Sequence, residues 1–169
     1  MLPHPLMPAP AGRAIEVQGE ISRDAAALRF VVAGPVPLIP AKAMSQRADD
    51  LWKTTCFELF IAPLGEPGYV EFNFSPSTRW AAYAFDAYRG GMRRWPLAAS
   101  PQIEPIENGI RVTVDVSHLP PPPWQIGLSA VIEERDGTKS YWALGHAPGA
   151  PDFHNRDCFI ATLAAPTRP

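Results

Sequence analysis

Residues 69–85 read YVEFNFSPSTRWAAYAF, and the start of this stretch carries side chains suited to binding a polar ligand. In an extended strand, alternate side chains point to opposite faces. Phe72 and Phe74 therefore share one face, and Glu71, Asn73 and Ser75 share the other. The aromatic face belongs in a hydrophobic core. The polar face is either a solvated surface or a row of hydrogen-bonding groups directed at a ligand.

A second carboxyl group lies in the preceding segment, LWKTTCFELFIAP, in which Glu58 alternates with core-type residues. Because only the short turn LGEPG separates the two segments, Glu58 and Glu71 are candidates to face each other across paired strands. Three interpretations stay open. The pair lies on a solvated face, or accepts hydrogen bonds from sugar hydroxyls, or forms the acid and the base or nucleophile of a glycosidase-like hydrolase.

Motifs of the common catalytic families are absent from the sequence. It contains no GxSxG, HExxH or GxGxxG and no Walker-type phosphate loop. Ser129 and Ser140 fall inside expected strands without the sharp turn that exposes a nucleophile. We therefore expect a binding protein rather than an enzyme.

Histidines near the C-terminus raise the alternative of a metal or haem site. His146 and His154 bracket the segment HAPGAPDFH, which also contains Asp152. Two imidazoles and a carboxylate are ligands that bind a divalent cation, although this spacing matches no strong metal motif and favours hydrogen bonds within the loop. Met92 with either histidine is the candidate axial pair for a haem.

Tryptophans are numerous, with five in 169 residues. Trp52, Trp95 and Trp124 lie at the edges of expected strands or in loops. An indole exposed near a strand end can stack on the apolar face of a sugar ring while polar neighbours bind its hydroxyls. The alternative is that these rings cap the core.

Short strands are the elements that position these residues. Period-2 segments recur along the chain and helix-period segments are scarce. The aromatic residues of the Ala-rich segment 80–87 favour a strand over a helix there. We expect an all-β, antiparallel β-sandwich of about nine or ten strands. A single domain over residues 13–169 would follow a flexible, Pro-rich N-terminus over residues 1–12. Strands are expected at 13–21, 26–34, 51–63, 69–75, 79–88, 102–106, 110–116, 124–134, 138–146 and 158–163.

Composition limits the partners and the compartment. Hydrophobic residues make up 46% and charged residues 19%, and the formal net charge is −2, so a nucleic-acid partner is not expected. No apolar run has the roughly 18–20 residues that a membrane span needs. No secretory signal is evident, which favours a cytoplasmic protein. The two cysteines, Cys56 and Cys158, are then expected as free thiols. Composition does not determine the oligomeric state.

Several segments together resemble a known family. LWKTTCFELFIAP, YVEFNFSPSTRWAAYAF, GIRVTVDVSHL, IGLSAVIEERDGTKSYWAL and PDFHNRDCFIATL, in this order, resemble the DOMON-like domains related to family 9 carbohydrate-binding modules. The resemblance extends from about Gln46 onward. It implies a β-sandwich whose relatives bind sugars or haem in a pocket at one sheet.

The resemblance also implies a set of site residues. In the carbohydrate-binding relatives a Trp precedes an acidic residue by six positions, which matches Trp52 and Glu58. On the next strand, these relatives have an Arg followed two residues later by an Asn, and both bind sugar hydroxyls. Asn73 matches the second, and Glu71 stands in place of the Arg, so the charge is reversed. Trp142 is nearest in position to the second Trp of the relatives' aromatic clamp. We therefore expect a non-catalytic module that binds a small polar ligand, a saccharide above all, through Trp52, Glu58, Glu71, Asn73, Ser75 and Trp142.

Overall fold

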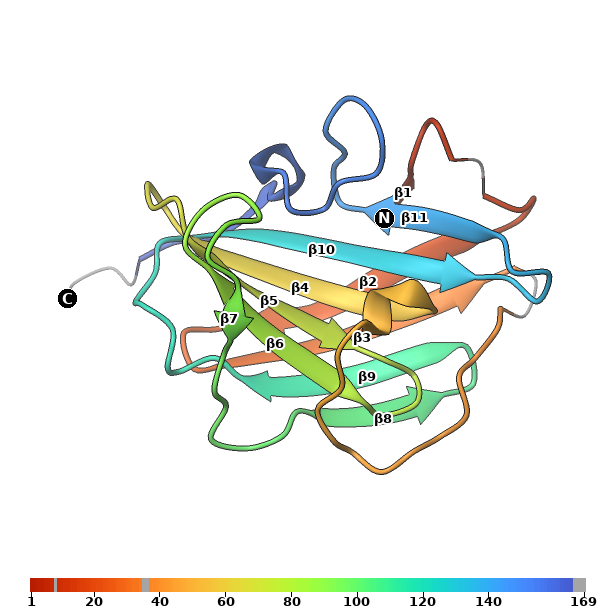
Figure 1. The fold of residues 1–169 in the computed structure, drawn as a ribbon, viewed down its shortest axis with the longest axis horizontal. Helices are drawn as coiled ribbons and strands as arrows, with labels where there is room; N and C mark the ends of the chain where they lie inside the picture. The colour runs from red at the N-terminus through yellow and green to blue at the C-terminus, as the bar shows by residue number, and fades with distance from the viewer. Residues whose placement is uncertain (8, 35–36, 166–169) are drawn as a thin grey trace.

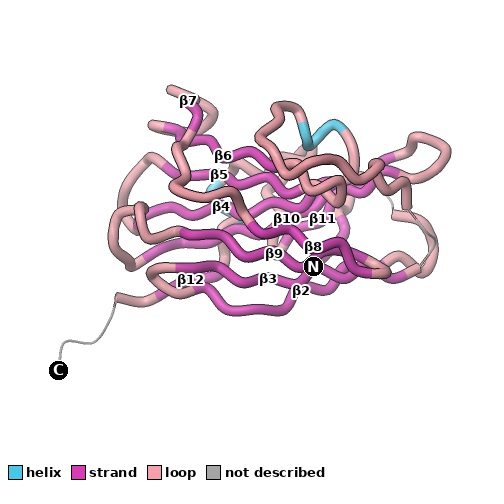
Figure 2. The backbone as a smooth tube through the Cα atoms, turned by 90° about the horizontal axis from the view of Figure 1, so that it is seen from below, coloured by secondary structure: helices cyan, strands magenta, loops and turns pink. Residues whose placement is uncertain are grey.

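Two antiparallel sheets face each other in the computed structural model, which describes residues 1–7, 9–34 and 37–165. The large sheet has eight strands in the order β1-β11-β10-β4-β5-β6-β7, with β12 also paired to β10, and the small sheet has the order β2-β3-β9-β8. Figures 1 and 2 show the sheets as two layers. The strands are β1 (Leu2–Pro3), β2 (Ala14–Ile21), β3 (Ala25–Ala33), β4 (Cys56–Pro63), β5 (Tyr69–Phe74), β6 (Trp80–Phe85), β7 (Arg93–Arg94), β8 (Gln102–Ile106), β9 (Gly109–Asp115), β10 (Trp124–Glu133), β11 (Lys139–Ala143) and β12 (Ala161–Leu163). Two short 3₁₀ helices are η1 (Leu51–Lys53) and η2 (Arg156–Cys158).

The expected β-sandwich is confirmed. The Ala-rich segment forms β6, paired along its length with β5. The two-residue strands β1 and β7 were not expected, because so few residues show no periodicity. The last expected strand is shorter than 158–163. Asn155 accepts a hydrogen bond from the backbone N–H of Asp157 and thereby caps η2, and β12 begins only at Ala161.

The core lies between the sheets and is built from the expected alternation. Phe57, Leu59 and Ile61 of β4 and Phe72 and Phe74 of β5 point inward and are fully or almost fully buried. They pack against a matching set from the small sheet that includes Phe30, Ile110, Val112 and Val114. Burial of these side chains is the main source of the sandwich's stability.

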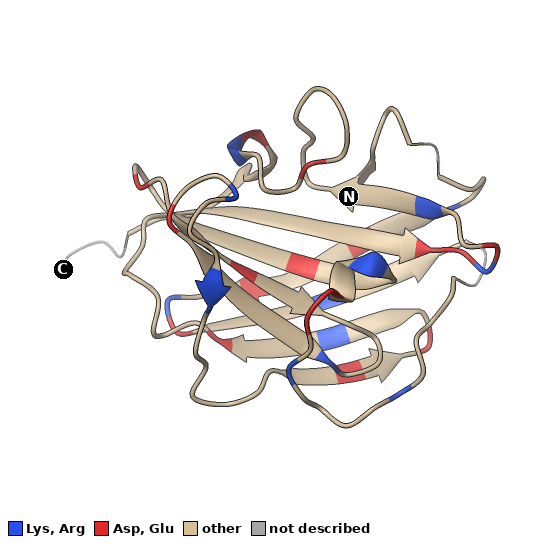
Figure 3. Cartoon of the chain, viewed as in Figure 1, with Lys and Arg blue, Asp and Glu red and all other residues tan. Residues whose placement is uncertain are grey.

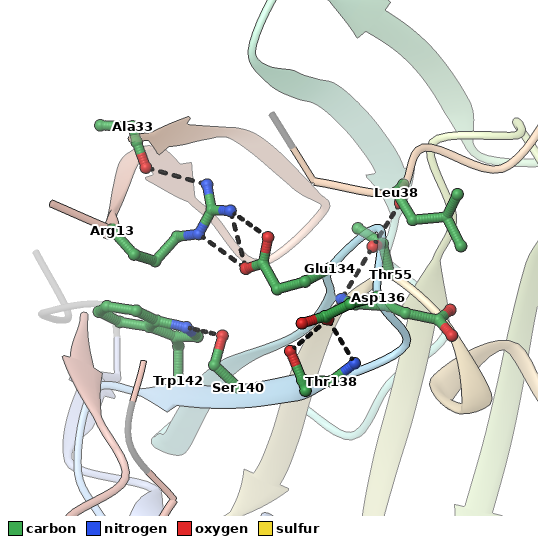
Figure 4. Close-up of polar contacts among 10 residues, drawn as sticks. Arg13, Ala33, Leu38, Thr55, Glu134, Asp136, Thr138, Ser140 and Trp142 are labelled. Atoms are coloured by element: carbon green, nitrogen blue, oxygen red, sulfur yellow. Dashed lines mark hydrogen bonds and ion pairs between the residues drawn. The ribbon is translucent and has the colours of Figure 1, made fainter. Parts of the chain in front are cut away.

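An ion pair joins the small sheet to the hairpin of β10 and β11. The Arg13 guanidinium donates to both carboxylate oxygens of Glu134, at 2.7 Å each, and to the carbonyl oxygen of Ala33 at 3.0 Å. The Arg13 side chain is fully buried, and the fork of these contacts is visible in Figure 4. Buried charges are tolerated when they are paired and hydrogen-bonded in this way.

The N-terminal segment, expected to be flexible over residues 1–12, has ordered contacts among its described residues. Leu2 and Pro3 pair with Ala143 and Trp142 at the edge of the large sheet. The terminal ammonium of Met1 donates to the carbonyl oxygen of Ile15 at 2.8 Å. An edge strand accommodates proline because one side of the strand needs no N–H donors. The Pro-rich composition therefore does not prevent strand pairing here.

The part of the chain that the structure describes contains no helix with the length and apolar character needed to cross a membrane.

Candidate functional site

The polar face of β5 is buried rather than solvated. Every residue of β4 except the last, and every residue of β5, is buried. Glu58 is 3% exposed and Glu71 is 5% exposed. Their side chains project from the outer face of the large sheet, which is the face turned away from the core. Figure 3 shows acidic positions within β4 and β5. A solvated sheet face is thus excluded as the setting of these carboxyl groups.

Strand register places the two glutamates as diagonal neighbours. Glu58 lies directly opposite Asn73, and Glu71 lies two residues from Asn73 on the same face. Each carboxyl group receives one hydrogen bond from the sheet. Ser129 Oγ donates to Glu58 Oε2 at 2.5 Å, and Asn73 Nδ2 donates to Glu71 Oε1 at 2.7 Å. The second oxygen of each glutamate has no hydrogen bond within the described part of the chain.

Burial changes the protonation of this pair. Desolvation, with the nearby charge of Glu71, raises the pKa of Glu58 to about 8. Desolvation also raises the pKa of Glu71 to about 7, against the opposing hydrogen bond from Asn73. Both groups are therefore poised to gain or lose a proton near neutral pH, because the charged form of each is disfavoured in a water-poor site.

A cavity of about 960 Å³ opens above the two carboxyl groups. Its floor is the outer face of the large sheet, and its walls come from the N-terminal segment, the η1 region, the β6–β7 loop and the loop that follows β11. The volume is at the upper end of the range for small-molecule sites. Aromatic side chains form a large part of the lining: Trp52, Phe60, Tyr83, Phe85, Tyr141 and Phe153.

Charges at the rim of the cavity are already paired. Arg89 Nη2 binds Asp152 Oδ1 at 2.8 Å, and Arg94 Nη2 binds Asp49 Oδ2 at 2.7 Å. Arg93, the third arginine of the lining, pairs with Asp86. The rim arginines are thus matched by aspartates, whereas the described residues provide no Lys or Arg ion-pair partner for Glu58 or Glu71 within 4.0 Å.

His154 stands beside Glu71 as a neutral side chain. Desolvation, and then the charge of Arg89, lower the pKa of His154 to about 4. Its Nδ1 lies 2.8 Å from the Tyr69 hydroxyl, which also accepts a hydrogen bond from the backbone N–H of Arg89. If the Tyr69 hydroxyl donates to Nδ1, the ring proton is on Nε2. That nitrogen lies 4.0 Å from Glu71 Oε2, beyond hydrogen-bond distance.

The loop that carries His154 is held against the sheet by its own small apolar cluster. Phe159 packs on Phe60 at 5.3 Å between ring centroids and covers the backbone of Gly127. A Cβ at Gly127 would lie 2.7 Å from the Phe159 ring, so the absence of a side chain at Gly127 permits this packing. The cluster also includes Phe153 and Cys158. It fixes one wall of the cavity.

Three of the residues predicted from the sequence line this cavity. Trp52, in η1, is 52% exposed and forms part of the wall, and Glu58 and Glu71 form the floor. Asn73 lies beneath the floor. It donates to Glu71 and accepts a weak hydrogen bond from the Cys56 thiol at 3.5 Å, so it positions a carboxylate and does not line the cavity.

Two predicted residues lie outside the cavity. Ser75 Oγ is 2.8 Å from Ser77 Oγ in the turn after β5, where it stabilises the turn. Trp142 points to the opposite face of the large sheet, into the core, and its indole N–H donates to Ser140 Oγ at 2.9 Å (Figure 4). Side chains alternate between the two faces along β11, so the register of this strand determines the face on which Trp142 lies. The sequence alone did not reveal that register.

The residues of the alternative metal and haem sites are distributed differently. His154 and Met92 line the cavity, whereas His146 binds the carbonyl oxygen of Leu2 and stacks edge-on against His4. Asp152 is engaged by Tyr88 and Arg89. Within residues 1–7, 9–34 and 37–165, no three His, Cys, Asp or Glu side chains are grouped closely enough to hold a metal ion. Cys56 and Cys158 are both buried free thiols.

Sequence reasoning missed several walls of the cavity. Tyr83 lies directly opposite Glu71 in the strand register, and its hydroxyl donates to Asp49 at 2.6 Å. Phe60 faces Glu71 from the other side. Alternation within β4 and β6 was the available signal for both rings. Arg89 and Phe153 come from loops, whose folding onto the sheet no periodicity indicates.

The fold and this site together define an antiparallel β-sandwich with a carboxyl-floored cavity on the outer face of its large sheet. No known family matches the sequence, and no curated protein does. Among solved structures, the chain is similar to one from Bacteroides uniformis ATCC 8492 that is called a "putative carbohydrate-binding protein". The TM-score is 0.63 at 12% sequence identity, over 87% of this chain and 76% of that chain. At this identity the likeness shows a shared fold, and membership of the DOMON-like family stays a prediction.

Proposed function

We propose that this protein is a non-catalytic binding module for a saccharide or a sugar-containing metabolite, bound on the outer face of the large sheet. The observation that carries the proposal is the cavity of about 960 Å³ that combines aromatic walls with two carboxyl groups whose second oxygens receive no hydrogen bond from the described residues. Sugar rings present apolar faces that stack on aromatic rings and hydroxyls that donate to carboxylates. Trp52 at the wall and Glu58 and Glu71 at the floor provide both kinds of contact.

The fold shared with the Bacteroides uniformis protein supports the proposal, because that protein's name refers to carbohydrate binding. The order of segments that resembles the DOMON-like domains is consistent with it. The site differs from the one the resemblance implies. Trp142 lies in the core, so the aromatic partner of Trp52 is another cavity residue, such as Tyr141 or Phe153.

Isothermal titration with a panel of mono- and oligosaccharides tests this function. At least one saccharide should bind with a Kd below about 1 mM. Trp52→Ala should weaken that binding by about tenfold or more, because the ring supplies a stacking surface. Leu64→Ala is the matched control, since Leu64 is similarly exposed at 58% and lies outside the cavity lining. A panel without any binder would contradict the proposal, as would equal affinity in Trp52→Ala.

A glycosidase-like hydrolase is the second candidate, because two carboxyl groups with raised pKa values face one cavity. Hydrolases place their two carboxyl groups on either side of the scissile bond. Here both carboxyl groups rise from the same face of one sheet at diagonal positions, so we favour binding over hydrolysis. We expect no turnover of aryl glycosides, and turnover that disappears in Glu58→Gln would establish the hydrolase instead.

A further inference from the structure

The two carboxyl groups at the floor of the cavity have no Lys or Arg ion-pair partner within 4.0 Å among the described residues, and burial favours their protonated forms. Glu58 Oε1 and Glu71 Oε2 receive no hydrogen bond from the described residues, although both side chains are more than nine-tenths buried. Neither atom is fully enclosed by protein, since both residues line the cavity. An unpaired carboxylate in a water-poor site is unfavourable, so a positive group supplied from outside the protein would stabilise it.

The charge of Arg89 lowers the pKa values of both glutamates, but no arginine at the rim forms an ion pair with either of them. Arg89, Arg93 and Arg94 each pair with an aspartate at the rim. His154, whose Nε2 lies 4.0 Å from Glu71 Oε2, is neutral because burial lowers its pKa to about 4. The rim arginines are therefore matched by aspartates, and the glutamates of the floor have no Lys or Arg partner among the described residues.

Aromatic rings flank Glu71 on both neighbouring strands. Phe60 and Tyr83 sit on either side of Glu71 in one cross-strand row. Neighbouring strands are about 4.8 Å apart, so a group bound at Glu71 is within about 6 Å of both rings. Carboxylates combined with aromatic rings are the surroundings in which proteins bind ammonium groups, through charge and through cation–π contacts.

We propose that the ligand carries a protonated amine, which binds at the free oxygens of Glu58 and Glu71 between the rings of Phe60 and Tyr83. This inference rests on the proposed saccharide function and makes it more specific. The ligand class is an amino sugar with a free amino group, as opposed to a neutral sugar or an N-acetylated one. The remaining aromatic wall, with Trp52, would contact the sugar ring.

Three sets of matched sugars test the inference: glucosamine, galactosamine and mannosamine, each with its parent hexose and its N-acetyl derivative. Binding is measured by NMR or calorimetric titration near neutral pH, where the amines are largely charged. At least one free amine should bind about tenfold more tightly than both of its neutral counterparts. Cyclohexylamine, which has the amine without hydroxyls, is the fourth probe and should bind more weakly than that amino sugar.

The outcomes separate this inference from the proposed function. If a neutral or N-acetylated sugar binds as tightly as its amine, the inference of an amine site is overturned and the proposed saccharide function is retained. Cyclohexylamine that binds as tightly as the amino sugar supports the amine site and contradicts the saccharide. If no probe binds, the inference fails, and the panel of mono- and oligosaccharides decides the proposed function separately.

Charge-removing variants provide the second measurement. Glu71→Gln and Glu58→Gln keep the shape of the side chain, and each should abolish the preference for the amine, so that the amine and its parent hexose bind with equal affinity within about threefold. If the glutamates had only a structural role, the variants would weaken the binding of the amine and of the hexose equally, and this result would overturn the inference. Glu104→Gln is the control, because Glu104 is exposed on the small sheet, paired with Arg111, and should leave the preference unchanged.

Discussion

At the residue scale, the protonation of Glu58 and Glu71 links the site to the stability of the protein. Both carboxyl groups have pKa values raised above the ordinary value, to about 8 and about 7, because burial disfavours their charged forms. The folded chain therefore keeps protons that the unfolded chain has already released. Stability is greatest while both groups are protonated, and it falls as pH rises through the folded pKa values.

Between about pH 6.5 and pH 8.5, the free energy of unfolding of the wild type should fall by about 2 kcal/mol. His154 contributes with the opposite sign at the lower end of this window, because its folded pKa is lowered to about 4 while the unfolded histidine still binds protons near its ordinary pKa. Glu58→Gln and Glu71→Gln should each reduce the fall and be more stable than wild type at the higher pH. Urea unfolding of the wild type and of each variant at both pH values measures this change in the free energy of unfolding. Glu104→Gln should behave like wild type, and an undiminished slope in both site variants would contradict the prediction.

At the element scale, the strands were predictable and the loops were not. Alternation of apolar and polar residues placed Glu58 and Glu71 on a common non-core face, because side-chain direction in a strand follows directly from sequence parity. The family resemblance assigned Trp142 to the binding site, and its register in β11 places it in the core. Placing Tyr83 and Phe60 beside Glu71 requires knowledge of which strands pair. Placing Arg89 and Phe153 in the lining requires knowledge of how the loops fold onto the sheet, which depends on packing between distant segments.

The wall formed by the loop after β11 should depend on Gly127. Gly127→Ala places a methyl group against the Phe159 ring, and we expect a destabilisation of about 1–3 kcal/mol. Because Phe159 packs in the cluster that holds the loop carrying His154, ligand affinity should fall as well. Thermal unfolding and titration measure the two effects.

Gly90→Ala is the matched control for stability, since the nearest atom to its Cβ would be at an ordinary 3.7 Å. Equal stability of the two glycine variants would show that Phe159 can move without loss.

At the scale of the whole molecule, a buried ion pair joins the start of β2 to the hairpin of β10 and β11. Arg13→Met leaves the Glu134 carboxylate with no partner in this ion pair, and we expect a loss of about 3–5 kcal/mol. Replacing both groups, Arg13→Met with Glu134→Leu, should recover much of that loss, because no unpaired charge then remains. Denaturant unfolding of the two single variants and the double variant measures the coupling. Additive effects would indicate that the two side chains act independently.

The central claim is that a saccharide binds in the cavity on the outer face of the large sheet. Mapping backbone amide shifts by NMR while titrating the saccharide panel tests this most directly. We predict that at least one sugar shifts amides of β4, β5 and β6 and of the loop around His154, and leaves the small sheet unchanged. No shifts with any sugar, or shifts confined to the small sheet, would contradict the claim.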